Sequence, residues 1–199
     1  MSKTFKTWPP DIYAISSHKR DKSGRRVLPR ILHRKPRAGD VHPLKPAMLQ
    51  HCLQCVPPAY IYGLKAIELS PRQGDVGAPY GVYRLGEKRI RLYSCPTRFW
   101  RFSSLVWPCH EALLSRGARI IASQEDTASV LVEWHDPDDL EVFFIHVLFH
   151  ELGHHYVEQY RSSRGRPKTR KRNEIVADLH DFKISTHLRR RIAKKRADA

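Results

Sequence analysis

Two histidines and a glutamate occur together in the segment His150-Glu151-Leu152-Gly153-His154. On a helix, residues four apart project from the same side about one turn from each other, so both imidazoles can reach one ion. Glu151 is displaced about a quarter-turn round the helix, from where it can reach a metal-bound water. This spacing is typical of zinc hydrolases for that mechanical reason. We therefore expect a zinc-dependent peptidase in which His150 and His154 bind the metal and Glu151 is the catalytic base.

A chance occurrence of the motif is the alternative, because the chain holds His 12 in 199 residues. At that frequency a random match has odds on the order of a few per cent. The flanking residues favour a buried helix, since they are apolar on nearly every side: Phe143, Phe144, Ile145, Val147, Leu148, Phe149 and Leu152. Polar side chains inside a buried helix need partners, and a metal ion is one such partner.

A catalytic zinc usually takes three protein ligands and leaves one position for water. Several downstream residues could supply the third ligand, and the best placed is Glu174 in Asn173-Glu174-Ile175-Val176-Ala177-Asp178. A loop of about ten residues allows the second helix to fold back antiparallel beside the two histidines. Asp178 lies one turn beyond Glu174, where its carboxylate can hold the second ring nitrogen of a ligand histidine. His180 and Asp181 remain spare candidates.

With these residues, His-Glu-Leu-Gly-His followed by Asn-Glu-x-x-Ala-Asp, the chain resembles the gluzincin metallopeptidases. The order of strands, HExxH helix and glutamate helix is similar to minimal gluzincins and to the ImmA/IrrE-type metallopeptidases. The resemblance covers roughly residues 60–188, with its specific motifs at 150–154 and 173–178. It implies zinc bound by His150, His154 and Glu174, with Glu151 as the base and Asp178 behind a histidine. The helix-turn-helix segment that some ImmA/IrrE-type proteins carry is not recognisable.

Other zinc-peptidase patterns fit less well. A metzincin needs Gly and His where Val157 and Tyr160 occur, and a SprT-like protease needs a downstream His and a zinc ribbon. His155 points about a hundred degrees away from His154, so we expect a packing or surface residue.

The sequence does not choose the group that stabilises the oxyanion, for which Tyr156, Tyr160 and His180 are all conceivable. By resemblance, a strand near 127–134 offers an edge to which an extended peptide substrate can add.

The chain has a formal net charge of +16, very unevenly distributed. Residues 1–46 hold twelve Lys or Arg against three acidic residues, and residues 161–199 hold fourteen against four. The middle, residues 47–160, holds ten against thirteen. Basic flanks favour an anionic partner, either a nucleic acid or an acidic protein, although they are equally typical of solvated tails. The alternative function is therefore a nucleic-acid-binding protein with an inactive or structural zincin-like core.

The fold class that we expect is α+β, with a zincin-like core. It contains a small, mostly antiparallel sheet, a buried HExxH helix and a following helix that carries the glutamate. Strands are predicted near 64–70, as a hairpin at 81–85 and 88–93, and at 119–122 and 127–134. Helices are predicted at 47–54, 108–116, from about 136 to 161, and from about 173. The domain spans 47–188, between a basic, poorly ordered extension at 1–46 and a basic tail at 189–199.

Neither a signal peptide nor a membrane-spanning segment is recognisable, so we expect a cytoplasmic protein without membrane contact that acts on a protein or peptide. The four cysteines do not form a disulfide framework in a chain of this length. Cys52-x-x-Cys55 could join Cys95 and Cys109 in a structural metal site, but two buried thiols on a short helix fit the spacing better.

Overall fold

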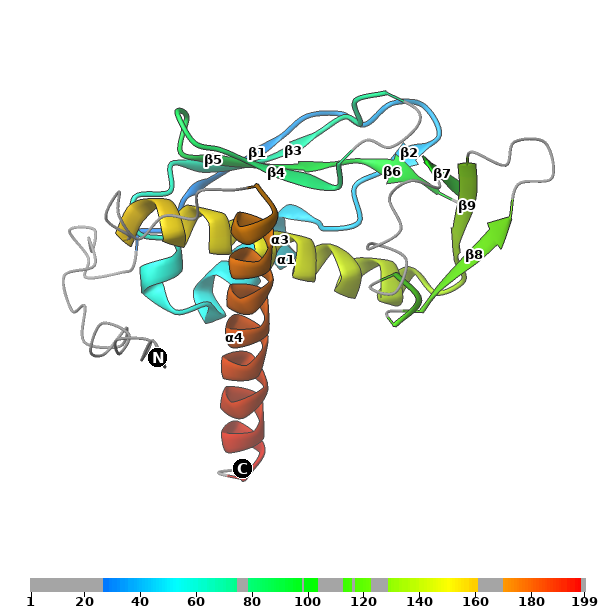
Figure 1. Cartoon of the computed structure of the whole chain (residues 1–199). Helices are drawn as coiled ribbons and strands as arrows, with labels where there is room; N and C mark the ends of the chain where they lie inside the picture. The colour runs from blue at the N-terminus through cyan, green and yellow to red at the C-terminus, as the bar shows by residue number, and fades with distance from the viewer. Residues whose placement is uncertain are drawn as a thin grey trace, which may run out of the picture.

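The structure is a computed structural model, and it describes residues 27–74, 79–97, 99–103, 113–115, 117–122, 129–160 and 170–197. Three small sheets, three α-helices and a short 3-10 helix make up most of this part of the chain (Figure 1). The α+β class is therefore confirmed at this level. No helix in these ranges is long and apolar enough to cross a membrane.

The central sheet has four strands in the order β1-β3-β5-β4. They are β1 (Arg30–His33), β3 (Ala66–Ser70), β5 (Arg89–Tyr93) and β4 (Gly81–Arg84). The predicted hairpin is present, since β4 and β5 pair antiparallel. However, β3 pairs with β5 rather than with β4, and both β1–β3 and β3–β5 are parallel.

The prediction of one small, mostly antiparallel sheet is therefore wrong for the sheet that packs on the HExxH helix. The physical reason is non-local pairing: β3 lies parallel to β5, and β1, from the segment expected to be poorly ordered, adds to β3 in parallel. The same segment supplies β2 (Asp40–Val41), which pairs with β6 (Cys95–Pro96). Residues 1–26 of the predicted extension lie outside the described residues.

The third sheet is antiparallel, with β9 (Ser129–Trp134) between β7 (Phe99–Ser103) and β8 (Ala118–Ala122). Strand β9 leads directly into helix α3 (Pro137–Tyr160), which carries the HExxH motif. The predicted helix at 108–116 falls largely outside the described residues.

Helix α3 begins where its sequence predicts. The side chain of Asp136 accepts a hydrogen bond from the backbone N–H of Asp138 at 2.8 Å, and Pro137 occupies the first helical position. The acidic residues of the first turn also favour the positive end of the helix dipole.

The hydrophobic core lies between one face of the central sheet and the helices α1 (Pro46–Cys55) and α3 (Figure 1). The short 3-10 helix η1 (Pro58–Tyr60) closes the core beside α3. Alternate residues of the strands, Ile67 and Leu69 on β3 and Ile90 and Leu92 on β5, are buried in this core.

Helix α4 (Arg170–Ala197) packs against α3, then extends away from the rest of the protein (Figure 1). It continues through most of the segment expected to be a separate basic tail, because that segment is rich in Arg, Lys and Ala, which are good helix formers.

Candidate metal centre

The two motif histidines and the glutamate of α4 meet where α3 and α4 pack together. The Nε2 atoms of His150 and His154 are 3.1 Å apart, and the Oε2 atom of Glu174 lies 3.0 Å from the first and 3.5 Å from the second. Two ligands of a tetrahedral zinc site, each about 2.0–2.1 Å from the ion, are about 3.3 Å apart. The three donor atoms are therefore spaced as a single small cation requires, and these residues could hold a metal ion.

The chemistry of the donors supports the same conclusion. When both histidines are neutral, two imidazole nitrogens and a carboxylate oxygen direct lone pairs at one another, and a positive charge, either a proton on His150 or a metal ion, makes the arrangement favourable. Within the described residues, this is the group of three metal-ligating side chains whose donor atoms converge in this way.

Asp178 holds the other side of the first histidine. Its Oδ1 atom lies 2.8 Å from Nδ1 of His150, which donates the hydrogen bond and leaves Nε2 facing Glu174. Burial lowers the pKa of His150, but the Asp178 hydrogen bond and the neighbouring carboxylates outweigh burial and raise that pKa to about 9. A metal ion at this position must displace that proton, because only the neutral imidazole is a ligand.

His154 has a partner on α4 as well. The side chain of Asn173 accepts a hydrogen bond from His154, whose pKa is lowered by burial and by the neighbouring His150. Asn173 directly precedes the predicted ligand Glu174 in the same motif, but its hydrogen bond with His154 was not predicted from the sequence. Both imidazoles are thus oriented by side chains of the same helix.

Glu151 lies beside the metal ligands but on a more enclosed side of α3, with 7% of its surface exposed. The backbone N–H of Tyr83 on β4 donates a hydrogen bond to its carboxylate. Burial raises the pKa of Glu151 to about 7, against the opposing effects of His150 and of the Tyr83 hydrogen bond. A carboxylate with a pKa near neutrality is suited to accept and return a proton.

His155 is a packing residue, as its spacing predicts, and it is completely buried. Its Nε2 lies 2.9 Å from the carbonyl oxygen of Tyr62, so the ring N–H donates there. Its Nδ1 is then free to accept from the hydroxyl of Tyr83 at 3.1 Å. Tyr83 therefore links β4 to α3 twice, through its side chain to His155 and through its backbone to Glu151.

Two of the three oxyanion candidates, Tyr156 and His180, lie in the core. Tyr156 and His180 are buried in contact with each other and with Tyr60, and Nδ1 of His180 lies 2.9 Å from the hydroxyl of Tyr60. Both side chains therefore belong to the core. The side chain of Tyr160, the third candidate, is outside the part of the structure that is described. The expected peptide-binding edge at 127–134 is also wrong, because β9 is paired on both sides.

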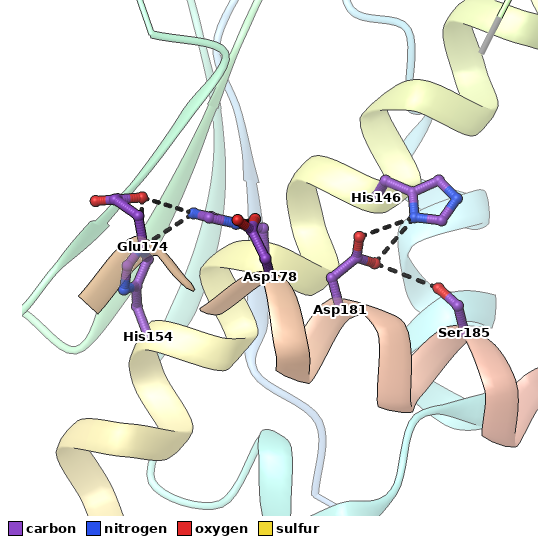
Figure 2. Close-up of polar contacts among 7 residues, drawn as sticks. His146, His154, Glu174, Asp178, Asp181 and Ser185 are labelled. Atoms are coloured by element: carbon purple, nitrogen blue, oxygen red, sulfur yellow. Dashed lines mark hydrogen bonds and ion pairs between the residues drawn. The ribbon is translucent and has the colours of Figure 1, made fainter. Parts of the chain in front are cut away.

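The spare ligand candidate Asp181 binds a different histidine. Its carboxylate lies 2.9 and 3.1 Å from Nδ1 of His146, and Ser185 donates a hydrogen bond to it (Figure 2). His146 precedes His150 by four residues, which places it on the same side of α3; this spacing is the signal that could have revealed the contact. The pairs with Asp181, Asp178 and Glu174 occur in opposite order on α3 and α4, so the helices pack antiparallel there.

The cysteines do not take part in a converging group of ligands within the described residues. Cys52 on α1 and Cys95 on β6 are buried, and burial raises their pKa values to about 11 and about 12. They are unreactive thiols under ordinary conditions. Cys55 is partly exposed, and Cys109 lies outside the described residues.

Comparison of the chain with protein-family models, with curated proteins and with solved structures gives no match.

Proposed function

We propose that this chain is a zinc-dependent endopeptidase in which His150, His154 and Glu174 bind the metal and Glu151 is the catalytic base. The observation that supports the proposal most is the convergence of the three donor atoms at 3.0–3.5 Å, next to an enclosed carboxylate. Two imidazoles and one carboxylate form a ligand set that catalytic zinc ions use, and the resemblance to gluzincins leads to the same residues.

In the proposed reaction, the residues of the site have separate roles. His150, His154 and Glu174 would hold a zinc ion, which would supply a water of lowered pKa and polarise the scissile carbonyl. Glu151 accepts the proton of the attacking water at its carboxylate and delivers it to the leaving amide nitrogen. The backbone N–H of Tyr83 holds this carboxylate in place, and Asp178 holds the ring of His150.

We further propose that an extended peptide substrate lies along β4 instead of β9. Among the described strands, β4 has a single neighbour, β5, so one of its edges is unpaired. Tyr93 donates its backbone N–H to the carbonyl of Tyr80, so by alternation Gly81 and Tyr83 direct their peptide groups to that edge. The N–H of Tyr83 is already donated to Glu151, so a substrate strand would use the groups of Gly81 and the carbonyl of Tyr83. Because Tyr83 also contacts Glu151, a strand added here runs next to the proposed base.

The test is a paired measurement of zinc content and cleavage. We expect one zinc per purified full-length chain, and cleavage of fluorescently labelled casein that Glu151→Gln abolishes without loss of zinc. Glu141→Gln is the matched control, since it makes the same change on the same helix and should keep activity. Absence of bound zinc, or equal cleavage by the Glu151→Gln protein, would refute the proposal.

A second candidate function is nucleic-acid binding by the basic flanks, which the charge distribution of the sequence favours. It predicts binding that weakens steeply with added salt, whether or not the chain cleaves peptides.

A further inference from the structure

The two faces of the central sheet differ sharply in composition. Helices α1 and α3 lie on one face, into which Ile31, Ile67 and Ile90 project from neighbouring strands (Figure 1). Successive residues of a strand point to opposite faces, so the residues between these isoleucines project from the other side. No helix of the described residues covers that side (Figure 1).

Arginines dominate the face of the sheet that no described helix covers. One row across the strands reads Arg30, Ala66, Arg89 and Arg84, and the next reads Leu32, Glu68, Arg91 and Val82. Arg34, immediately after β1, reaches the same face because its guanidinium contacts Glu68. We call this group the arginine face; it comprises Arg30, Arg34, Arg84, Arg89 and Arg91.

Glu68 fixes three of these arginines from beneath. Arg34 Nε lies 2.6 Å from Oε1 of Glu68, while Arg89 Nη1 and Arg91 Nε lie 3.0 and 3.3 Å from Oε2. Glu68 is only 1% exposed, whereas the side chain of Arg34 is 63% exposed. The carboxylate is therefore hidden, and the surface presented to solvent is basic.

The charge balance of the face is positive even when the nearest exposed acid is included. Glu87, in the turn before β5, contacts Arg89 at 3.5 Å and Arg91 at 3.7 Å. Among the described residues, five arginines against Glu68 and Glu87 leave a net charge of +3 on this face. Each guanidinium has five N–H donors, and the bonds to the two carboxylates use only some of them.

We propose that the arginine face binds the phosphate backbone of a nucleic acid. Guanidinium groups are planar forks that match phosphate oxygens in pairs, and the strand register places Arg84 directly beside Arg89, with Arg91 two residues further along β5 on the same face. Three of them are already held by Glu68, so less side-chain entropy is lost when they bind. The charge is complementary to that of a polyanion, and the basic flanks of the chain would extend the same surface potential.

The face also determines the mode of binding. Tyr93 projects to this side of the sheet but is buried, so it offers no ring on which a base can stack. The described side chains of this face therefore favour contacts with phosphates, which carry no sequence information. The site lies on the opposite side of the sheet from α3 and the metal ligands, and it does not depend on the proposed peptidase activity.

The test uses the full chain and fluorescein-labelled oligonucleotides, a 20-base oligothymidylate and a 20-base-pair duplex, titrated by anisotropy at several salt concentrations. The variant is Arg30→Ala with Arg84→Ala, because both arginines are exposed and neither is among the three that contact Glu68. The control is Lys45→Ala with Arg119→Ala, which removes the same charge from exposed positions elsewhere in the fold. Arg84→Glu serves as a second variant, and thermal melting verifies that each protein is folded.

We expect the Arg30/Arg84 variant to bind the duplex about tenfold more weakly than the control at 50 mM salt, with a salt slope shallower by about two. The loss should be equal for mixed and homopolymeric sequences. Equal affinity and slope for variant and control would overturn the proposal, as would no binding by the unmodified chain. Polyglutamate competing as well as the oligonucleotide would also overturn it, since that result indicates an acidic protein as the partner.

Discussion

Gly153 lies at a close contact between α3 and α4. Replacing it with alanine should therefore move the metal ligands on the two helices apart. A Cβ atom at Gly153 would lie 2.9 Å from the backbone oxygen of Ala177, 2.9 Å from Cβ of His180 and 3.1 Å from Cα of Ala177. Carbon atoms in favourable contact are about 3.5 Å apart or more, so the helices must move by about 0.6 Å. Backbone atoms cannot rotate out of the way as the end of a flexible side chain can.

This displacement is large for a metal site. Glu174 lies one turn before Ala177 and Asp178 directly follows it, whereas both histidine ligands belong to α3. Metal–ligand distances tolerate deviations of only about 0.2 Å, so a relative shift of both helices weakens the Glu174 bond and the Asp178 contact together. We expect the dissociation constant for zinc to rise by at least 10–100-fold, the range found when residues that orient ligands are lost.

The assay is competition for zinc between the protein and a chromophoric chelator, with thermal melting of the metal-free protein alongside. Gly86→Ala is the matched control, because a Cβ there meets nothing within 4 Å. Overpacking at Gly153 should also destabilise the metal-free fold by about 1–3 kcal/mol, less the higher helix propensity of alanine. If Gly153→Ala binds zinc as tightly as Gly86→Ala, the close helix contact does not position the ligands, and the reasoning is refuted.

Three further changes test individual contacts. Asp178→Asn should lower zinc affinity about 10–100-fold by weakening the hold on His150, measured in the same competition; unchanged affinity would rule out this role. Tyr83→Phe removes the hydroxyl that binds His155 and should destabilise the fold by about 1 kcal/mol in urea denaturation. Zinc content should stay the same, because this contact lies on the side of α3 that carries Glu151 and not among the metal ligands. Loss of zinc would contradict that placement. Glu68→Gln should destabilise the fold at neutral pH by about 1–2 kcal/mol. Burial opposes ionisation of Glu68, but its hydrogen bond with Ser70 and the neighbouring arginines lower its pKa below the ordinary 4.5. Its contribution is therefore present above pH 4.5 and is lost as the pH falls through the lowered pKa, so the two proteins should converge in acid.

Features that depend on neighbours along the chain were predicted correctly. The start of α3 at Asp136 and Pro137 follows from local hydrogen bonding and the fixed φ of proline. The hairpin of β4 and β5 follows from alternation of apolar residues around a short turn. The placement of His150 and His154 on one side of a helix follows from helical geometry alone.

Pairings between distant segments were not accessible in the same way. Strand β1 comes from a segment with little periodicity of apolar residues. It forms a strand because the edge of β3 supplies backbone hydrogen-bond partners, which the local sequence does not reveal. The edge next to Glu151 proved to be β4 rather than the 127–134 strand, since both sides of β9 are occupied. Tyr156 and His180, which looked available for catalysis, are instead packed on Tyr60 in the core.

The sequence by itself determined the chemistry of the candidate metal centre, because two imidazoles at i and i+4 and a carboxylate one loop away leave few other arrangements on two helices. The tertiary structure alone decided how closely those donors approach, which side chains orient them and what lies on the far side of the sheet. Those properties depend on the contact of Gly153 with Ala177, on the Tyr83 link and on the strand register that gathers five arginines around Glu68. Each is a distance between residues far apart in the chain, which no local pattern of residue types encodes.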